Sequence, residues 1–138
     1  MTLVTKTVRF DAAHVLTNHD GLCKNLHGHT YRVEICAGGD LPAASTDMVV
    51  DFKEIKRIAN DIIVARFDHA FIYNTASAGE CEIAAVVERL GMKTVALPFR
   101  STAENLASLF FRDLKPYLAG LIAVKVWETP DSSAEFRA

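Results

Sequence analysis

Alternating apolar and polar residues near the start of the chain predict two β-strands, each with one buried face. In the first strand the apolar face carries Val4, Val8, Phe10, Ala12 and His14. In the second, the odd positions carry His27, His29, Tyr31, Val33 and Ile35, whereas the even positions 30, 32 and 34 are polar. Histidines therefore stand at the end of the apolar face of both predicted strands.

Apolar residues spaced three and four apart predict three helices further along the chain. The first helix follows a turn-rich segment at 38–42 and a short strand at 48–50. Asp51 suits its N-cap, and Glu54 is placed to close a capping box. The buried face of this helix would carry Ile55, Ile58, Ala59, Ile62 and Ile63.

The other two predicted helices lie on either side of a short strand at 94–97. One ends at Gly91, a residue that suits the position just after a helix. Its apolar stripe consists of Ile83, Val86, Val87 and Leu90. The other begins with Ser101 as N-cap and has Glu104 three residues later. Its apolar face consists of Leu106, Leu109, Phe110 and Leu114.

The last clear strand, 121–128, ends its apolar row on a carboxylate. Ile122, Val124 and Val126 share one face with Glu128. A charged group at the end of a buried row is costly unless it is paired. Glu128 is therefore expected to have a partner.

Length and composition fit one soluble domain over residues 1–138. Half of the residues are apolar and 23% are charged, and no run approaches the ~20 apolar residues of a membrane span. The net charge of −2 and the scattered Lys and Arg argue against a nucleic-acid partner. The N-terminus lacks the features of a signal peptide, and three separated cysteines form no disulfide framework, so the cytoplasm is expected.

His14, His27 and His29 form a candidate metal site. His27 and His29 share one strand face, so their imidazoles can converge on one ion, although many such pairs bind nothing. A neighbouring antiparallel strand could bring His14 alongside them. Three neutral nitrogen ligands would leave one coordination position of a zinc ion open for catalysis.

Cys23 and the pair Asp68-His69 allow two interpretations each. Cys23 could be a fourth ligand that closes a purely structural zinc site, or a thiol whose pKa is lowered by a nearby cation and which transfers protons. Asp68-His69 could be an ordinary turn, or an imidazole oriented by a carboxylate for proton exchange with that thiol.

Five short motifs occur in the order found in the 6-pyruvoyl-tetrahydropterin synthase family, which the chain therefore resembles over most of its length. They are Phe10-Asp-Ala-Ala-His14, Cys23-Lys-Asn-Leu-His27-Gly-His29, Asp68-His69, Thr102-Ala-Glu104 and Trp127-Glu128-Thr129. The spacing of three residues between Cys23 and His27 is similar to that of the bacterial 6-carboxytetrahydropterin synthases. Each motif alone is unremarkable, but their combination is specific.

The resemblance implies an α+β tunnelling fold: an antiparallel sheet with helices on one face, and three sheets joined into a barrel. It also implies a homohexamer made of two trimers, with active sites between subunits. Barrel closure would cover the edges of the sheet. The region 75–100 is longer than in compact members, and we assign it no catalytic part.

The resemblance further implies a zinc-dependent carbon–carbon lyase. Its substrate would be 7,8-dihydroneopterin triphosphate, and its products 6-carboxy-5,6,7,8-tetrahydropterin, acetaldehyde and triphosphate, on a route to queuosine-type deazapurines. An alternative is a 6-pyruvoyl-tetrahydropterin synthase, a carbon–oxygen lyase that releases triphosphate from the same substrate. A second alternative is a non-catalytic zinc-binding module.

The residue roles implied by the resemblance divide into metal binding, proton transfer and pterin binding. His14, His27 and His29 would hold zinc, Cys23 would move protons, and Asp68 with His69 would serve as its relay. Glu128 would bind the paired N–H donors of the pterin ring. Thr102 and Glu104 match pterin-side residues of the family, but a helix cap explains them equally well.

Overall fold

The computed structural model describes residues 1–41 and 47–138 of the chain. Its strands are β1 (Thr2–His14), β2 (His27–Gly39), β3 (Ala70–Asn74), β4 (Thr94–Leu97), β5 (Leu121–Thr129) and β6 (Ser132–Arg137). Its helical segments are η1 (Leu22–Lys24), α1 (Phe52–Ala59), the π-helical turn η2 (Asn60–Val64), α2 (Ala65–Phe67), α3 (Ala78–Arg89) and α4 (Ala103–Leu114). None of the helices in these two ranges is long and apolar enough to cross a membrane.

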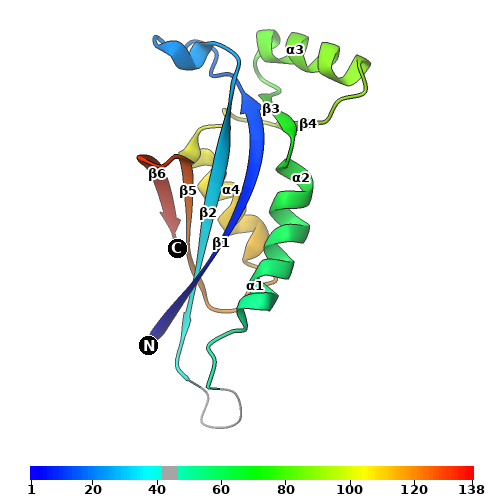
Figure 1. Ribbon diagram of the computed structural model, residues 1–138. Helices are drawn as coiled ribbons and strands as arrows, with labels where there is room; N and C mark the ends of the chain where they lie inside the picture. Colours follow the sequence, from blue (N-terminus) through cyan, green and yellow to red (C-terminus); the bar gives the residue numbers. More distant parts are fainter. Residues whose placement is uncertain (42–46) are drawn as a thin grey trace.

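One sheet in the order β4-β3-β1-β2-β5-β6 forms the centre of the described chain. β1 and β2 are its longest strands (Figure 1) and pair antiparallel from Thr2 opposite Gly39 to His14 opposite His27. β5 and β6 extend the antiparallel part, whereas β3 and β4 join in parallel beyond β1. The sheet is therefore antiparallel over four strands and mixed at one edge, because α3 connects β3 to β4 as a crossover.

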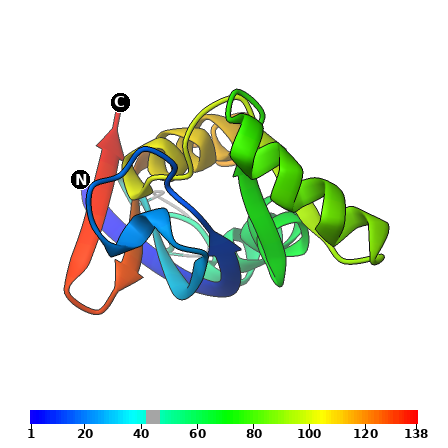
Figure 2. The same ribbon diagram turned by 90° about the horizontal axis from the view of Figure 1, so that it is seen from above.

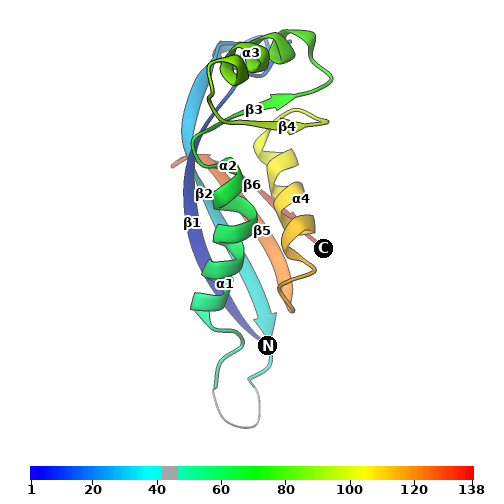
Figure 3. The same cartoon turned by 90° about the vertical axis from the view of Figure 1, so that its right-hand side faces the viewer.

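The continuous helical segment α1-η2-α2 and the helix α4 lie side by side on one face of the sheet (Figure 3). The predicted parity of β1 and β2 is confirmed, since Phe10, Tyr31, Val33 and Ile35 are buried beneath these helices. The α+β class with helices on one face is confirmed as well. α3 lies apart from the other helices, at the end of the sheet where β1 ends (Figure 1), and the view from above shows it on the side away from β6 (Figure 2).

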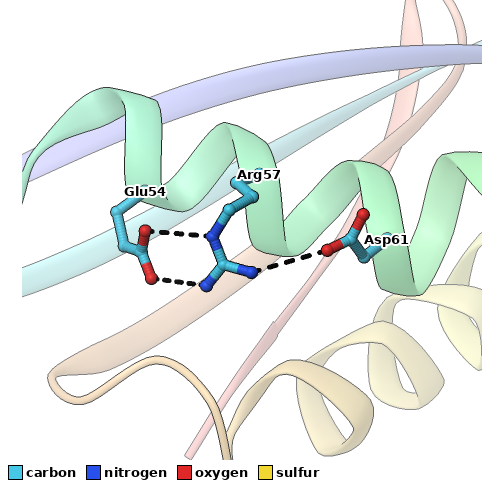
Figure 4. A network of polar contacts seen from close by, with 3 residues as sticks. All are labelled: Glu54, Arg57 and Asp61. Atoms are coloured by element: carbon cyan, nitrogen blue, oxygen red, sulfur yellow. Dashed lines mark hydrogen bonds and ion pairs between the residues drawn. The ribbon is translucent and has the colours of Figure 1, made fainter.

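The start of α1 follows from its cap and its apolar stripe. The Asp51 side chain accepts a hydrogen bond from the Lys53 N–H at 2.8 Å, which confirms the predicted N-cap. The Glu54 carboxylate binds Arg57, 2.6 Å from its Nη2, and Arg57 also reaches Asp61 (Figure 4). Glu54 thus takes part in an exposed i,i+3 pair and does not close the predicted capping box on the Asp51 N–H. The predicted stripe faces the core, with four members buried and the fifth partly buried: Ile55, Ile58, Ala59, Ile63 and Ile62.

α4 begins one residue later than predicted. Thr102, not Ser101, is the N-cap, and its hydroxyl accepts a hydrogen bond from the Asn105 N–H at 3.2 Å. Ser101 is fully buried and its hydroxyl lies beside an imidazole instead. The predicted apolar face is confirmed, because Leu106, Phe110 and Leu114 are completely buried and Leu109 packs against the core.

The predicted stripe of α3 is only half buried: Ile83 and Val87 pack against a small cluster at the end of the sheet, whereas the other two residues do not. Val86 and Leu90 are 45% and 60% exposed, and the buried members of the helix are Glu80 and Ala84. The helix exists, but it contacts the end of the sheet and not the main core. Its end is as predicted: Gly91 has φ +76°, and the Gly91 and Met92 N–H groups close a Schellman motif on the carbonyls of Glu88 and Val87.

Three further predictions about strands needed correction or extension. Residues 48–50 form no strand, because they find no ladder partner and Met48 is half exposed. β2 continues through Gly38 and Gly39, where a turn was predicted, and Pro42 lies outside the described residues. β6 was not predicted, because this edge strand is mostly polar and only Ala134 and Phe136 are partly buried.

Candidate metal centre and active site

The pairing of β1 with β2 brings the three histidines together. His14 is the direct partner of His27 in the ladder, and His29 follows two residues later on the same face of β2. Gly28 between them lies against β1, because a Cβ on it would be 3.1 Å from the Ala12 carbonyl oxygen. A side chain at position 28 would push the two strands apart, so glycine permits the close approach of the ligands.

The three imidazoles converge through one kind of atom. The Nε2 of His14 lies 2.9 Å from that of His27, and the Nε2 of His29 lies 3.1 Å from each of the other two. Tetrahedral zinc with Zn–N bonds of about 2.0–2.1 Å separates its ligand nitrogens by roughly 3.3 Å. The triangle of Nε2 atoms therefore fits one zinc-sized ion.

The opposite ring nitrogens indicate the tautomers. The Nδ1 of His27 lies 2.7 Å from the Asn25 carbonyl oxygen, and that of His14 lies 3.1 Å from the Ser101 carbonyl oxygen. A carbonyl only accepts, so each Nδ1 carries the hydrogen and each Nε2 presents a lone pair. Lone pairs this close repel one another, and a cation between them relieves the repulsion.

Burial also keeps these ligands neutral. Burial, followed by the neighbouring His27 and His29, lowers the pKa of His14 to about 4. Burial and His27 likewise lower the pKa of His29. Neutral imidazole is the form that binds metal, so His14 and His29 are in the binding form at neutral pH.

Cys23 lies in η1, in the connection between β1 and β2, and is half-buried. Its carbonyl accepts a hydrogen bond from the Leu16 N–H at 2.9 Å, which closes the connection beside the ligands. Within residues 1–41 and 47–138, the convergent metal-binding group consists of the three histidines without Cys23. The geometry of the single chain thus favours an open three-ligand site over a closed four-ligand one.

Asp68 and His69 form an ordered pair in the turn before β3. Asp68 accepts from the Asp11 N–H at 3.0 Å through Oδ1, and its Oδ2 lies 2.9 Å from the His69 Nδ1. The Asp11 hydrogen bond is the largest cause that lowers the pKa of Asp68. His69 is exposed and has a φ of +61°, a backbone conformation uncommon for a residue other than glycine.

His69 and the metal ligand His29 line the same cavity of about 550 Å³. Ile83, Val87 and Met92, from the region 75–100 to which we assigned no catalytic part, line it too. Lys93 also borders it, and its Nζ donates to the carbonyls of Ala65 and Asp68, each at 2.8 Å. The cavity therefore places the imidazoles of His29 and His69 along the same largely apolar walls.

Glu128 lies near the end of β5, the strand next to β2, and close enough to His27 to be affected by its charge. The β5–β6 register shifts between Trp127 and Thr129, so Glu128 occupies an irregular position at the strand end. Burial, followed by the charge of Glu104, raises the pKa of Glu128, while His27 opposes the shift. Glu128 and His29 border a second cavity, of about 430 Å³.

The remaining predicted residues lie at the start of α4. Thr102 is confirmed as a helix cap, and Glu104 is exposed in the first turn, close enough to affect the pKa of Glu128. Sequence reasoning missed the partners of the His14 ring. Ser101 resembled an N-cap, and Tyr31 resembled a core residue, so neither carried a separate signal.

Taken together, the fold and site define a small α+β protein with a three-histidine metal-binding group at one end of its sheet. Residues 3–138 match the family described as 6-pyruvoyl tetrahydropterin synthase. The chain belongs to this family.

Several relatives of the chain are named 6-carboxy-5,6,7,8-tetrahydropterin synthase. One from Haemophilus influenzae is 41% identical over 137 residues, covering 97% of both chains. One from Aquifex aeolicus is 34% identical over 158 residues, covering 97% of this chain and 96% of the relative.

Solved structures support the fold. The 6-pyruvoyl tetrahydropterin synthase of Caenorhabditis elegans has a TM-score of 0.70 and 24% identity, covering 100% of this chain and 97% of the other. That of Plasmodium vivax has a TM-score of 0.71 and 18% identity, covering 100% and 99%. At these identities the likeness concerns the fold alone.

Proposed function

We infer that this chain is a 6-carboxy-5,6,7,8-tetrahydropterin synthase. It converts 7,8-dihydroneopterin triphosphate into 6-carboxy-5,6,7,8-tetrahydropterin, acetaldehyde and triphosphate, and so acts as a carbon–carbon lyase in queuosine precursor synthesis. Relatives carrying that name cover nearly the whole chain, with identities up to 41%. The observation that carries the chemistry is the convergence of three Nε2 atoms within 3.1 Å of one another.

His14, His27 and His29 hold the metal, for which zinc is the proposed ion. Three neutral imidazoles are a ligand set of catalytic zinc sites, and the spacing of their nitrogens fits its size. When bound, zinc lowers the pKa of coordinated hydroxyls and stabilises negative charge on oxygen. His14 itself is buried, and largely apolar residues line the cavity that opens beside His29.

Proton transfer is assigned to Cys23, Asp68 and His69. Cys23 lies in the connection that carries the chain from one ligand strand to the other, so its thiolate can take a proton from a substrate carbon near the ligands. His69 exchanges protons with that thiol, and Asp68 orients the His69 ring through its Nδ1. The shared cavity of His29 and His69 supports this assignment.

Substrate binding is assigned to Glu128, with Thr102 and Glu104 beside it. The two carboxylate oxygens of Glu128 match the paired N–H donors of a 2-amino-4-oxo pyrimidine ring. The charge of Glu104 acts on Glu128, which supports placing these residues together at the pterin-binding end of the pocket. Thr102 fixes this end through its cap on α4.

The assembly we propose is a cytoplasmic homohexamer of two trimers, with active sites between subunits. The sheet of the described chain ends in two edge strands, β4 and β6. Joining such sheets into a barrel would pair their exposed backbone groups. A pocket between subunits would then be built from residues of more than one chain.

Product analysis tests the reaction directly. Zinc-loaded protein is incubated anaerobically with 7,8-dihydroneopterin triphosphate, and products are identified by mass spectrometry together with an acetaldehyde assay. We expect acetaldehyde and the 6-carboxy product in equal amounts, and neither with His29→Ala. A product that keeps its three-carbon side chain would replace this proposal with a 6-pyruvoyl-tetrahydropterin synthase. Zinc binding without turnover would leave only a zinc-binding module.

A further inference from the structure

His14 differs from the other two ligands in its surroundings. Its side chain is 1% exposed, and the Nδ1 side of its ring faces oxygen atoms only. The Ser101 hydroxyl lies 3.0 Å from Nδ1, the Ser101 carbonyl oxygen 3.1 Å, and the Tyr31 hydroxyl 3.3 Å. No solvent is needed to satisfy this nitrogen.

The position of the single N–H hydrogen on the His14 ring decides whether this residue can bind a metal. A neutral imidazole has one N–H, and the nitrogen that binds a metal must lack it. With the hydrogen on Nδ1, the ring donates to Ser101 and leaves the Nε2 lone pair toward His27 and His29. With the hydrogen on Nε2, the bare Nδ1 could accept from the Ser101 and Tyr31 hydroxyls, but it would face the lone pairs of the Ser101 carbonyl oxygen at 3.1 Å, and the metal position would be blocked.

Ser101 is held rigidly on both sides. It lies between β4 and α4 and is fully buried. The following residue, Thr102, caps α4, and the preceding residue, Arg100, accepts at its carbonyl from the Asn105 Nδ2 at 3.0 Å. Arg100 also donates to the Thr17 carbonyl, three residues after His14. The segment therefore joins the start of α4 to the end of β1 beside the ligand.

We propose that Ser101, assisted by Tyr31, is a positioning residue that holds His14 in the tautomer and orientation required for metal binding. The inference rests on the proposed metal function of the three histidines. It assigns to the β4–α4 connection a part in the metal site that is independent of the pterin-side role proposed for Thr102 and Glu104.

Metal affinity in Ser101→Ala, Tyr31→Phe and the double variant tests this role. Zinc affinity is measured by competition with a chromophoric chelator, and the visible spectrum of the Co²⁺-substituted protein reports ligand geometry. Loss of a partner that orients a ligand costs about 10–100-fold in metal affinity. We expect Ser101→Ala to lose about tenfold, since the carbonyl remains, Tyr31→Phe to lose less, and the double variant to lose more than either. The Co²⁺ spectrum of Ser101→Ala should change as well.

Ser108→Ala, on the same helix, is the matched control and should bind zinc like the wild type. The thermal midpoint of the metal-free proteins separates positioning from folding, and we expect little change in it. Zinc affinities within twofold of wild type for Ser101→Ala and the double variant, with an unchanged Co²⁺ spectrum, would overturn the proposal. Equal losses of thermal midpoint with and without metal would also overturn it. A wild-type protein that binds zinc but makes no product contradicts the proposed reaction and leaves this result intact.

Discussion

Cys23 and His29 are expected to separate metal binding from turnover. Cys23→Ala should retain zinc and lose activity, because the ligand cluster of the described chain does not include its thiol. His29→Ala should lose both. Zinc content after desalting and acetaldehyde release are the two measurements. Cys36→Ala, a half-buried thiol further along β2, is the control and should change neither. Release of zinc by Cys23→Ala would support the closed structural site.

Glu128 gives the pterin end a pH dependence. In the proposed role its ionised form binds the N–H donors of the pterin, and burial, followed by the charge of Glu104, raises its pKa. Pterin affinity should therefore be complete above this raised pKa and fall as the pH drops through it. Glu104→Gln removes the like charge and lowers the pKa of Glu128, so the fall should move to lower pH. Fluorescence titration of the zinc-loaded protein with 6-carboxy-5,6,7,8-tetrahydropterin measures this, with the exposed Glu82→Gln as control. A fall at the same pH in Glu104→Gln would contradict the coupling.

At the level of residues, the sequence predicts those positions that follow from the two-residue period of a strand or the 3.6-residue period of a helix. Strand parity placed His14, His27 and His29 on one face, and a single antiparallel pairing was enough to bring them together. Ser101 could not be predicted in the same way, because it reaches His14 across 87 positions of the chain. Such a contact depends on how α4 packs against the sheet, which no local pattern contains.

Gly91 offers a test at the level of the helix α3. Its φ of +76° lies in the left-handed region, and a Cβ there would meet no atom within 4 Å. Gly91→Ala should therefore cost about 1 kcal/mol from backbone strain alone. Gly79→Ala is the matched change in the first turn, where φ is ordinary and the nearest atom to a Cβ is 4.0 Å away. It should be neutral or stabilising. Thermal midpoints at equal protein concentration check the opposite signs, and equal shifts would refute the assignment.

At the level of elements, the spacing of apolar residues predicted where helices occur better than it predicted what each helix packs against. The stripes of α1 and α4 face the core, whereas α3 has the same kind of spacing and leaves Leu90 exposed. Its sequence cannot show that the helix lies at the end of the sheet and not on its face. β6 was not predicted because its residues are mostly polar, as an edge strand buries few side chains.

The whole molecule is expected to work as an assembly. Native mass spectrometry should find a particle of six chains, because pairing of the β4 and β6 edges is the proposed route to a closed barrel. Dilution that dissociates the particle should abolish product formation. A single chain with full activity at working concentration would contradict both the hexamer and the shared active site.

The direct pairing of His14 with His27 has a consequence for the order in which the chain folds, binds metal and assembles. All ligands fall within residues 14–29, so they are available together once the first two strands have been synthesised. Closing so short a connection costs little entropy. A bound ion would therefore cross-link the newly synthesised β1–β2 hairpin before the helices α1 to α4 have been made. The residues that hold His14 from behind are then supplied in two stages: Tyr31 with the hairpin itself, and Ser101 only when α4 arrives. Metal loading can thus precede subunit assembly, and the contacts of Ser101 with His14 form only afterwards.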